Sequence, residues 1–301
     1  MTSSAHFFSS TYTSPAEFPI LEKSILFHGD TVDDRGNSAI AFSGAEFTEK
    51  ILLKYNFENM RITVGNESIS ADQCVKLLEP HIINHNVVLE ATTLGFAELF
   101  CVVRTLISLQ VCRFQISYVE PRDYTKPIGS KLFELSELIS GYHPIPFSVL
   151  DLSSDEVEAG VFFLGYESER LARALEEYQM ISNKDIKVVF GVPAYQAGWE
   201  LNAIVPHLQI LNEQRNFVIA YCAANDPGSA FDCLQITRQS LSQNHKMFIA
   251  PIGTKPCGIA AAVFASLFPA QVGLIYDHPQ KKNRRTMGVN IWHRYAIRID
   301  Y

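Results

Sequence analysis

Five short apolar runs in the second half of the chain alternate with segments of helical length, and this alternation constrains the fold more than any other feature. The runs cover residues 160–165, 186–192, 217–222, 247–251 and 272–276. Apolar residues at helical spacing mark the segments 168–180, 198–213, 228–242 and 257–268. Because parallel strands need a crossover connection, which is usually a helix, the pattern predicts a parallel sheet.

The first half of the chain shows the same pattern, but the boundaries between its elements are less clearly marked in the sequence. We expect strands at 24–28, 87–91 and 113–119, a helix at 95–109, and a loop or irregular hairpin over the polar residues 29–47. A last strand at 289–299 is expected to close one edge of the second sheet. The predicted fold class is therefore α/β, with a Rossmann-like, doubly wound and mostly parallel sheet in two α/β halves. The predicted divisions are a flexible tail at 1–20, an N-terminal α/β domain with a proline-rich connector at 21–150, and a C-terminal Rossmann-like domain at 151–301.

Composition limits the classes of function. Of the 301 residues 47% are hydrophobic and 19% are charged, which is enough apolar material for a globular core. The formal net charge of −7 argues against a protein that coats nucleic acid. The six cysteines contain no CxxC pair of the kind found in metal sites and redox motifs, so we interpret them as reduced core residues. Reduced cysteines are typical of cytoplasmic proteins, and a cytoplasmic location is therefore expected. We find no targeting signal, no membrane-spanning stretch and no metal-ligand motif.

The loop after the apolar run 247–251 is the strongest candidate binding site. Gly253 lets a backbone approach closely, Thr254 supplies a hydroxyl and Lys255 supplies a mobile positive charge. A helix follows directly, and the amino terminus of a helix attracts anions through its free N–H groups. The segment therefore predicts a site for a phosphate-bearing ligand, with an ordinary strand–helix turn and a surface lysine as the alternative.

Other loops follow predicted strands and would meet at the same kind of edge, because ligands of open parallel sheets bind at the carboxyl ends of the strands. Their candidate ligand-binding residues are Thr92, Thr93, Gly165, Ser168, Asn225 and Asp226. Each also has a structural alternative. Asp226 before a Pro-Gly pair is typical of a helix N-cap, and the two threonines are placed to cap the helix at 95–109.

A short basic stretch stands out in an acidic chain. Lys281, Lys282, Arg284 and Arg285 follow the last apolar run of the second half. The residues are candidates for contact with the phosphates of a nucleotide or nucleic-acid strand, with a solvated surface loop as the alternative.

Candidate catalytic residues form two small polar groups. His28 with Asp30, and Asp277 with His278, each follow a predicted strand and could act as acid and base. No hydrolase, zinc, P-loop or complete dinucleotide-binding motif accompanies them, and no cofactor is indicated.

The run Ile252-Gly253-Thr254-Lys255, together with Asn225-Asp226-Pro227, resembles the CARF group of ligand-sensing Rossmann-like domains in antiviral-defence effectors. The resemblance covers about the last 140 residues. It implies a pocket for cyclic oligonucleotides, usually at a dimer interface, with Gly253, Thr254 and Lys255 as phosphate contacts. The chain departs from the family at Ile252, where a second glycine is usual, and it carries no recognisable nuclease domain.

Three functions remain in competition. The first is a cytoplasmic nucleotide- or nucleic-acid-linked sensor or accessory protein, which would act with a partner subunit or as a homo-oligomer and have no membrane partner. The second is an enzyme for a phosphorylated or nucleobase small substrate. The third is a structural subunit of a multiprotein complex. Ligand-dependent stabilisation would separate the first from the third.

Overall fold

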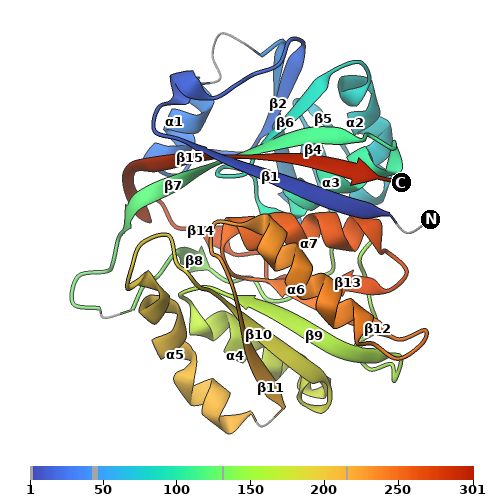
Figure 1. Cartoon of the computed structure of the whole chain (residues 1–301), viewed down its shortest axis with the longest axis vertical. Helices are drawn as coiled ribbons and strands as arrows, with labels where there is room; N and C mark the ends of the chain where they lie inside the picture. The colour runs from blue at the N-terminus through green and yellow to red at the C-terminus, as the bar shows by residue number, and fades with distance from the viewer. Residues whose placement is uncertain (1–2, 43–46, 131, 215) are drawn as a thin grey trace. The chain divides into compact units, whose positions relative to one another are not determined.

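The computed structural model describes residues 3–42, 47–130, 132–214 and 216–301. The chain forms two compact units (Figure 1). Unit 1 contains residues 1–125 and 283–301, and unit 2 contains residues 126–282. Both are α/β: unit 1 holds a mixed eight-stranded sheet and unit 2 an all-parallel five-stranded sheet, with a separate two-stranded sheet beside it.

The sheet of unit 1 has the order β1-β15-β7-β6-β2-β3-β4-β5. Its middle strands β7, β6, β2 and β3 run parallel, whereas the strands added at either side pair antiparallel. Its strands are β1 (Ser4–Tyr12), β2 (Ser24–His28), β3 (Glu49–Asn56), β4 (Arg61–Val64), β5 (Glu67–Ser70), β6 (Asn86–Glu90), β7 (Arg113–Tyr124) and β15 (Thr286–Asp300), and its helices are α1 (Asp34–Phe42), α2 (Cys74–Ile82) and α3 (Phe96–Ser108), with 3-10 turns at Pro15–Glu17 and Ala71–Gln73.

Three expectations for unit 1 are corrected by the structure. Residues 4–12 are not a flexible tail, because β1 pairs with β15 over its whole length. Residues 34–42 of the expected loop form α1, which packs on β7 and β15 through Ala39, Val119 and Trp292; residues 43–46 lie outside the described residues. The last strand belongs to unit 1 and does not close the second sheet, because β15 pairs with β7 and β1.

The sheet of unit 2 has the order β11-β10-β9-β12-β13. Its apolar strands are the ones expected, with ends that shift by a few residues. The elements are β9 (Val157–Leu164), β10 (Asp185–Gly191), β11 (Phe217–Cys222), β12 (Lys246–Pro251), β13 (Val272–Leu274), α4 (Ser168–Glu177), α5 (Trp199–Glu213), α6 (Pro227–Gln239) and α7 (Lys255–Leu267), with a 3-10 turn at Gln179–Asn183 and the small pair β8 (Ser136–Leu138) and β14 (Gln280–Lys281).

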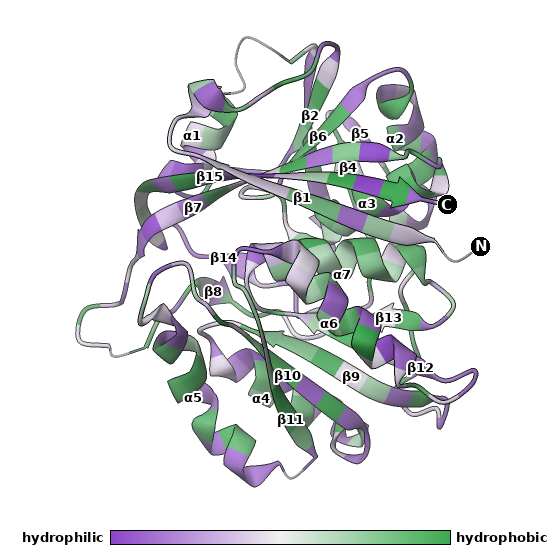
Figure 2. Ribbon diagram, viewed as in Figure 1, coloured by the Kyte–Doolittle hydropathy of each residue, from purple (hydrophilic) through white to green (hydrophobic). Residues whose placement is uncertain are grey.

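Helices cover both faces of this sheet (Figure 1). On one face, α4 and α5 pack against alternate strand residues such as Phe162, Val188 and Phe248. On the other face lie α6 and α7, which contact each other through the rings of Phe231 and Phe264. Figure 2 shows that α7 is hydrophobic along most of its length, in keeping with its burial from Pro256 to Ser266.

The division between the units lies earlier than the expected boundary near residue 150. It falls after Thr125, and the chain returns to unit 1 at Asn283. The proline-rich connector, expected at 120–153, therefore belongs to unit 2 from Lys126 onward, and its strand β8 pairs there with β14. Among the described residues, no helix combines the length and apolar character that crossing a membrane requires.

Candidate functional site

The carboxyl ends of the five parallel strands of unit 2 meet at one edge of the sheet. The chain runs outward from β9 through β10 to β11 and then returns to place β12 on the other side of β9. The direction of winding therefore reverses between β9 and β12, so the helices that follow these two strands, α4 and α7, lie on opposite faces of the sheet. Such a reversal is where open α/β sheets bind ligands.

Two glycines allow the β9 and β12 loops to touch at this reversal. A Cβ atom added to Gly253 would lie 3.0 Å from the carbonyl carbon of Phe163, and one added to Gly165 would lie 3.1 Å from the carbonyl oxygen of Ile252. Both distances are tighter than ordinary contacts. Gly253 was expected to let a backbone come close, and the backbone that does so is that of β9.

Thr254 ties the β12 loop to the β11 loop. Its Oγ1 atom lies 2.9 Å from the carbonyl oxygen of Ala224 and 3.1 Å from the Sγ atom of Cys257. Thr254 is the N-cap residue of α7, yet its side chain accepts no hydrogen bond from that helix. The first turn of α7 therefore has no side-chain cap at Thr254, and the partly buried Lys255 begins the helix there.

Asp226 caps a helix, as one of the two interpretations of the sequence proposed. Its carboxylate accepts hydrogen bonds from the N–H groups of Gly228, at 2.9 Å, and Ser229, at 3.2 Å. Pro227 occupies the first position of α6. Asn225 precedes this cap in the same loop, so both candidate residues lie at the carboxyl end of β11.

Glu167 and Ser168 follow β9, and Ser168 is the first residue of α4. The Glu167 carboxylate accepts hydrogen bonds from the N–H groups of Leu135 and Ser136, both at 2.8 Å, and from the Ser136 hydroxyl at 2.9 Å. These contacts fasten the connector to the loop after β9. Gly165 and Ser168 thus belong to a turn that is held on one side by the β12 loop and on the other by the connector.

A buried ion pair joins α4 to the loops after β12 and β13. The Arg170 guanidinium donates from Nε and Nη2 to the two oxygens of Asp277, at 2.6 and 2.5 Å, and from Nη1 to the carbonyl oxygen of Ile252 at 3.1 Å. Burial alone would lower the pKa of Arg170, but the Asp277 charge raises that pKa above its ordinary value. Asp277, a predicted catalytic residue, is therefore engaged in a bidentate pair.

His278 is buried beside Asp277 with a backbone φ of 43°. Its Nε2 atom lies 3.2 Å from the carbonyl oxygen of His143, and its ring packs edge-on against Tyr276 with centroids 5.1 Å apart. Burial lowers the pKa of His278 to about 4, although the His143 hydrogen bond opposes that shift. The imidazole is consequently neutral at pH 7.

Thr92 and Thr93 lie in unit 1, so they do not join the unit 2 residues within one compact unit. Both are buried in the turn after β6, which is organised by Glu90. The Glu90 carboxylate accepts from the N–H groups of Thr92, at 2.9 Å, and Thr93, at 2.8 Å. The Thr92 hydroxyl accepts from the Val119 N–H, and the Thr93 hydroxyl accepts from the Gly29 N–H. Through these contacts, Thr92 and Thr93 stabilise the turn after β6.

His28 and Asp30 also belong to unit 1, at the end of β2. The Nδ1 atom of His28 lies 3.1 Å from the carbonyl oxygen of Gly29. Asp30 forms an exposed ion pair with Lys54, at 2.8 Å. The two predicted acid–base pairs, His28 with Asp30 and Asp277 with His278, therefore lie in different units.

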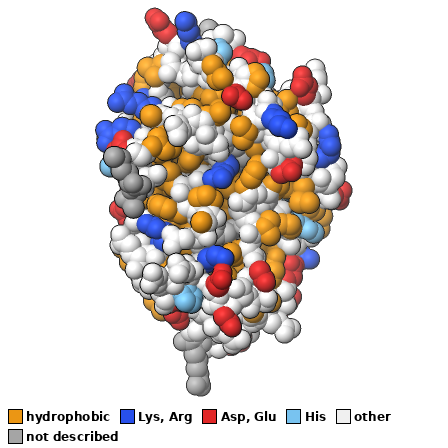
Figure 3. Space-filling model, turned by 90° about the vertical axis from the view of Figure 1, so that its right-hand side faces the viewer, with side chains coloured by type: hydrophobic (Ala, Val, Ile, Leu, Met, Phe, Trp, Pro, Cys, Tyr) orange, Lys and Arg blue, Asp and Glu red, His pale blue; other side chains and the backbone are white. Residues whose placement is uncertain are grey.

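The basic stretch is divided by the boundary between the units. Lys281 lies in β14, and Lys282 Nζ pairs with Glu134 at 3.0 Å. Arg284 donates its backbone N–H to the carbonyl oxygen of Val32, and the partly buried Arg285 lies 3.9 Å from Asp33. Basic side chains are likewise interspersed with acidic and hydrophobic ones on the face shown in Figure 3. Among the described residues, no group of three or more histidine, cysteine or acidic side chains is arranged to hold a metal ion.

Two sets of structurally prominent residues were not assigned to a site from the sequence. Arg170 lies in the first turn of the helix after β9, and an arginine so placed on an otherwise amphipathic helix is a usable signal. Arg294 and Arg298 alternate with Ala296 along β15, and Arg113 begins β7. The alternation was visible in the sequence and strands were expected at 113–119 and 289–299, but the pairing of these strands, which brings Arg113 opposite Arg298, was not predicted.

No family model and no curated protein matches the chain. Among solved structures, an N-terminal ketoreductase from a macrolactin assembly line is similar at 11% identity and a TM-score of 0.22, over 88% of this chain and 71% of that one. A ketoreductase domain from the bacillaene assembly line is similar at 10% identity and the same TM-score, over 90% of this chain and 71% of that one. At these TM-scores the likeness supports no conclusion about fold family or activity.

Proposed function

We propose that unit 2 is a Rossmann-like, doubly wound ligand-binding domain that takes a phosphate-bearing nucleotide or short oligonucleotide at the carboxyl edge of its sheet. The chain would then act as a nucleotide-responsive sensor or accessory protein. The observation that carries the proposal is the reversal of winding between β9 and β12, where the β12 loop leads into α7.

The local contacts favour an anion at this position. Thr254 directs its hydroxyl to Ala224 and Cys257 and not to the N–H groups of α7, so the amino terminus of that helix keeps its partial positive charge. Lys255 adds a cation at the first helical position. The nearby acidic residues Asp226 and Asp277 are engaged with a helix cap and with Arg170.

The proposal is tested by thermal unfolding of the wild-type protein and of Lys255→Ala against mono-, di- and cyclic oligonucleotides. The cyclic class is included because of the CARF resemblance. A ligand at about 100 times its Kd should add about 2.7 kcal/mol to the free energy of unfolding of the wild type. The variant should lose most of that stabilisation.

Lys246→Ala is the matched control, because Lys246 lies at the opposite end of β12, where it pairs with Glu156 at the surface. This variant should respond to ligand like the wild type. Absence of stabilisation by every nucleotide tested would contradict the proposal, as would an equal loss in both lysine variants.

A further inference from the structure

A cavity of about 430 Å³ lies on one face of the unit 1 sheet, where β1, β15 and β7 are neighbours. The register of these three strands explains which side chains form the floor of the cavity. Phe8 pairs with Ala296, and Ala296 pairs with Gln115, so these three side chains form one row across three strands. The small Ala296 side chain stands in the middle of the row and leaves the hollow.

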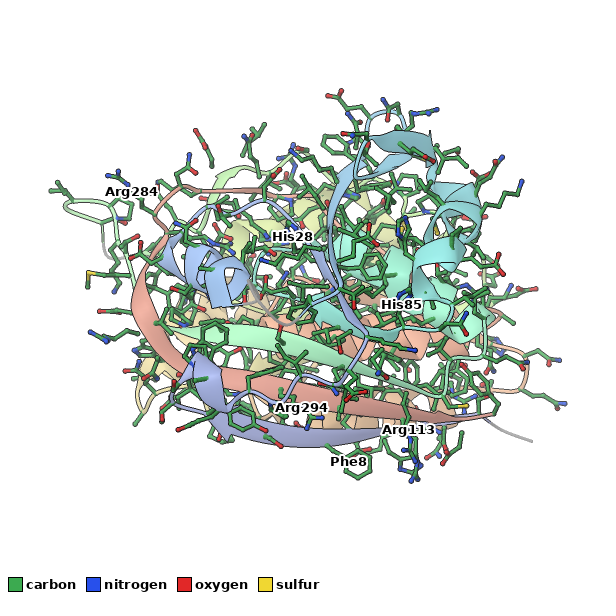
Figure 4. All side chains as sticks on the ribbon, turned by 90° about the horizontal axis from the view of Figure 1, so that it is seen from above. Phe8, His28, His85, Arg113, Arg284 and Arg294 are labelled. Carbon is green, nitrogen blue, oxygen red and sulfur yellow. The ribbon has the colours of Figure 1, made fainter. Side chains whose placement is uncertain are left out.

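Arginines stand on both sides of this row. Arg298 and Arg294 lie two residues to either side of Ala296, so their side chains share its face of β15. Arg113 on β7 pairs directly with Arg298. All three line the cavity together with Phe8 and Gln115, and Figure 4 labels Phe8, Arg113 and Arg294 on these neighbouring strands.

The charges around the cavity are unbalanced. Arg298 lies 3.2 Å from Asp300, but His6 also pairs with that carboxylate, at 3.0 Å. The Nε atom of Arg294 donates to the neutral Gln115 amide at 3.0 Å. Within the described part of the chain, no hydrogen bond or ion pair engages the Arg113 guanidinium. Three guanidinium groups thus face a hollow with one carboxylate among them.

The pairing of Arg113 with Arg298 is itself informative. Like charges directly opposite each other on antiparallel strands are destabilising, because their Cβ atoms are only about 5 Å apart. An anion held between the two guanidinium groups would remove this repulsion. Planar guanidinium groups suit phosphate oxygens because they donate two parallel hydrogen bonds.

We propose that this cavity is a second binding site, independent of unit 2, for a small organic phosphate with an aromatic group, such as a nucleoside 5′-phosphate. Arg113 and Arg298 hold the phosphate, and Arg294 supplies further positive charge across Ala296. Phe8 is 53% exposed at the rim and provides a ring on which an aromatic base stacks. The cavity volume matches that of sites for ligands of this size.

The test is isothermal titration of AMP and of inorganic phosphate into the full-length protein. Arg113→Gln should weaken AMP binding at least about tenfold, because a charge-assisted hydrogen bond is lost. Ala296→Leu fills the hollow without changing the charge and should abolish binding. Arg61→Gln, which removes an exposed arginine of the same unit outside the cavity, should bind AMP like the wild type.

Lys255→Ala separates this site from the one proposed in unit 2. Because the cavity is lined by unit 1 residues alone, AMP should still bind to Lys255→Ala, and that binding should depend on Arg113. The inference is overturned if AMP does not bind, if Arg113→Gln binds it as tightly as Arg61→Gln does, or if only Lys255→Ala loses it. If AMP and inorganic phosphate bind with equal affinity, the assignment to an aromatic phosphate is overturned. If oligonucleotides bind but AMP does not, the assignment to a small-molecule site is overturned.

Discussion

Asp33 shows how a single buried residue organises unit 1. Its carboxylate accepts hydrogen bonds from Arg35 at 2.8 Å, from the Thr286 hydroxyl at 2.8 Å and from the Gly36 N–H at 3.0 Å. Burial alone would raise the pKa of Asp33, but the Arg35 charge and these hydrogen bonds lower it to about 2. Thr286 begins β15, so this one carboxylate joins two segments that are 253 residues apart in the chain.

The lowered pKa of Asp33 predicts acid-dependent stability. The ionised carboxylate contributes fully above its pKa in the unfolded chain, near 4, and the contribution disappears as the pH falls through about 2. The difference corresponds to roughly 2 kcal/mol of unfolding free energy. In urea unfolding at several pH values, Asp33→Asn should be destabilised at pH 7 and should lose less stability than the wild type between pH 4 and pH 2.

Asp30→Asn is the control for this prediction, because Asp30 forms an exposed pair with Lys54. It should follow the wild-type pH profile, since exposed pairs contribute little to stability. A wild-type profile that Asp33→Asn reproduces unchanged would show that the acid sensitivity arises elsewhere.

Single residues also show why the candidate site could be predicted only in part. Gly253, Thr254 and Lys255 follow a strand as expected, because an apolar run that ends in glycine marks a strand end reliably. The partners of Thr254 and Asp277 were not predictable, since Ala224 and Arg170 reach them only through the fold. Long-range hydrogen bonds leave no local signal in the sequence.

Among the secondary-structure elements, prediction succeeded where a continuous apolar run or apolar residues at helical spacing mark the element in the sequence. The strand expected at 217–222 is β11, and the helix expected at 95–109 is α3 within a residue at each end. It failed for β1, whose Ser- and Thr-rich sequence is ordered by pairing with β15, and for α1, whose polar first turn is held by Asp33. Tertiary pairing overrides weak local preference in both cases.

The dependence of β15 on β1 predicts the result of a truncation. Deleting residues 1–12 removes the antiparallel partner of Trp292 to Asp300 and leaves one side of β15 unpaired. We expect a lower melting temperature and faster amide exchange in β15, while β9, β10 and β12 of unit 2 keep their protection. Hydrogen exchange followed by mass spectrometry measures the amide exchange rates of both units in one experiment.

Deletion of residues 1–3 serves as the comparison, because it leaves all of β1 in place. The truncation argument fails if β15 exchanges equally fast in the two deletion variants. It also fails if the longer deletion exposes the strands of unit 2 to the same extent as β15.

At the scale of the whole molecule, unit 2 is an insertion in the sequence of unit 1. The chain leaves unit 1 after Thr125 and returns at Asn283. The two ends are neighbours, because the Thr125 N–H donates to the carbonyl oxygen of Arg285 at 3.0 Å and its hydroxyl donates to that of Arg284 at 2.9 Å. Local composition could not reveal this arrangement, because the sequence of β15 differs little in composition from that of a strand of the unit 2 sheet.

The insertion predicts how unit 1 behaves when unit 2 is removed. Residues 1–125 alone lack β15, which lies between β1 and β7, so β1 would have no partner and the face that packs on α1 would lose Trp292. A chain in which a short glycine- and serine-rich linker replaces residues 126–282 retains the complete sheet. We expect a cooperative thermal transition and near-ultraviolet circular dichroism from the linked chain, and neither from residues 1–125. If residues 1–125 unfold as cooperatively as the linked chain does, β15 is dispensable and the division into these units is wrong, because a strand that lies between two others cannot be removed without loss of the pairing on both its sides.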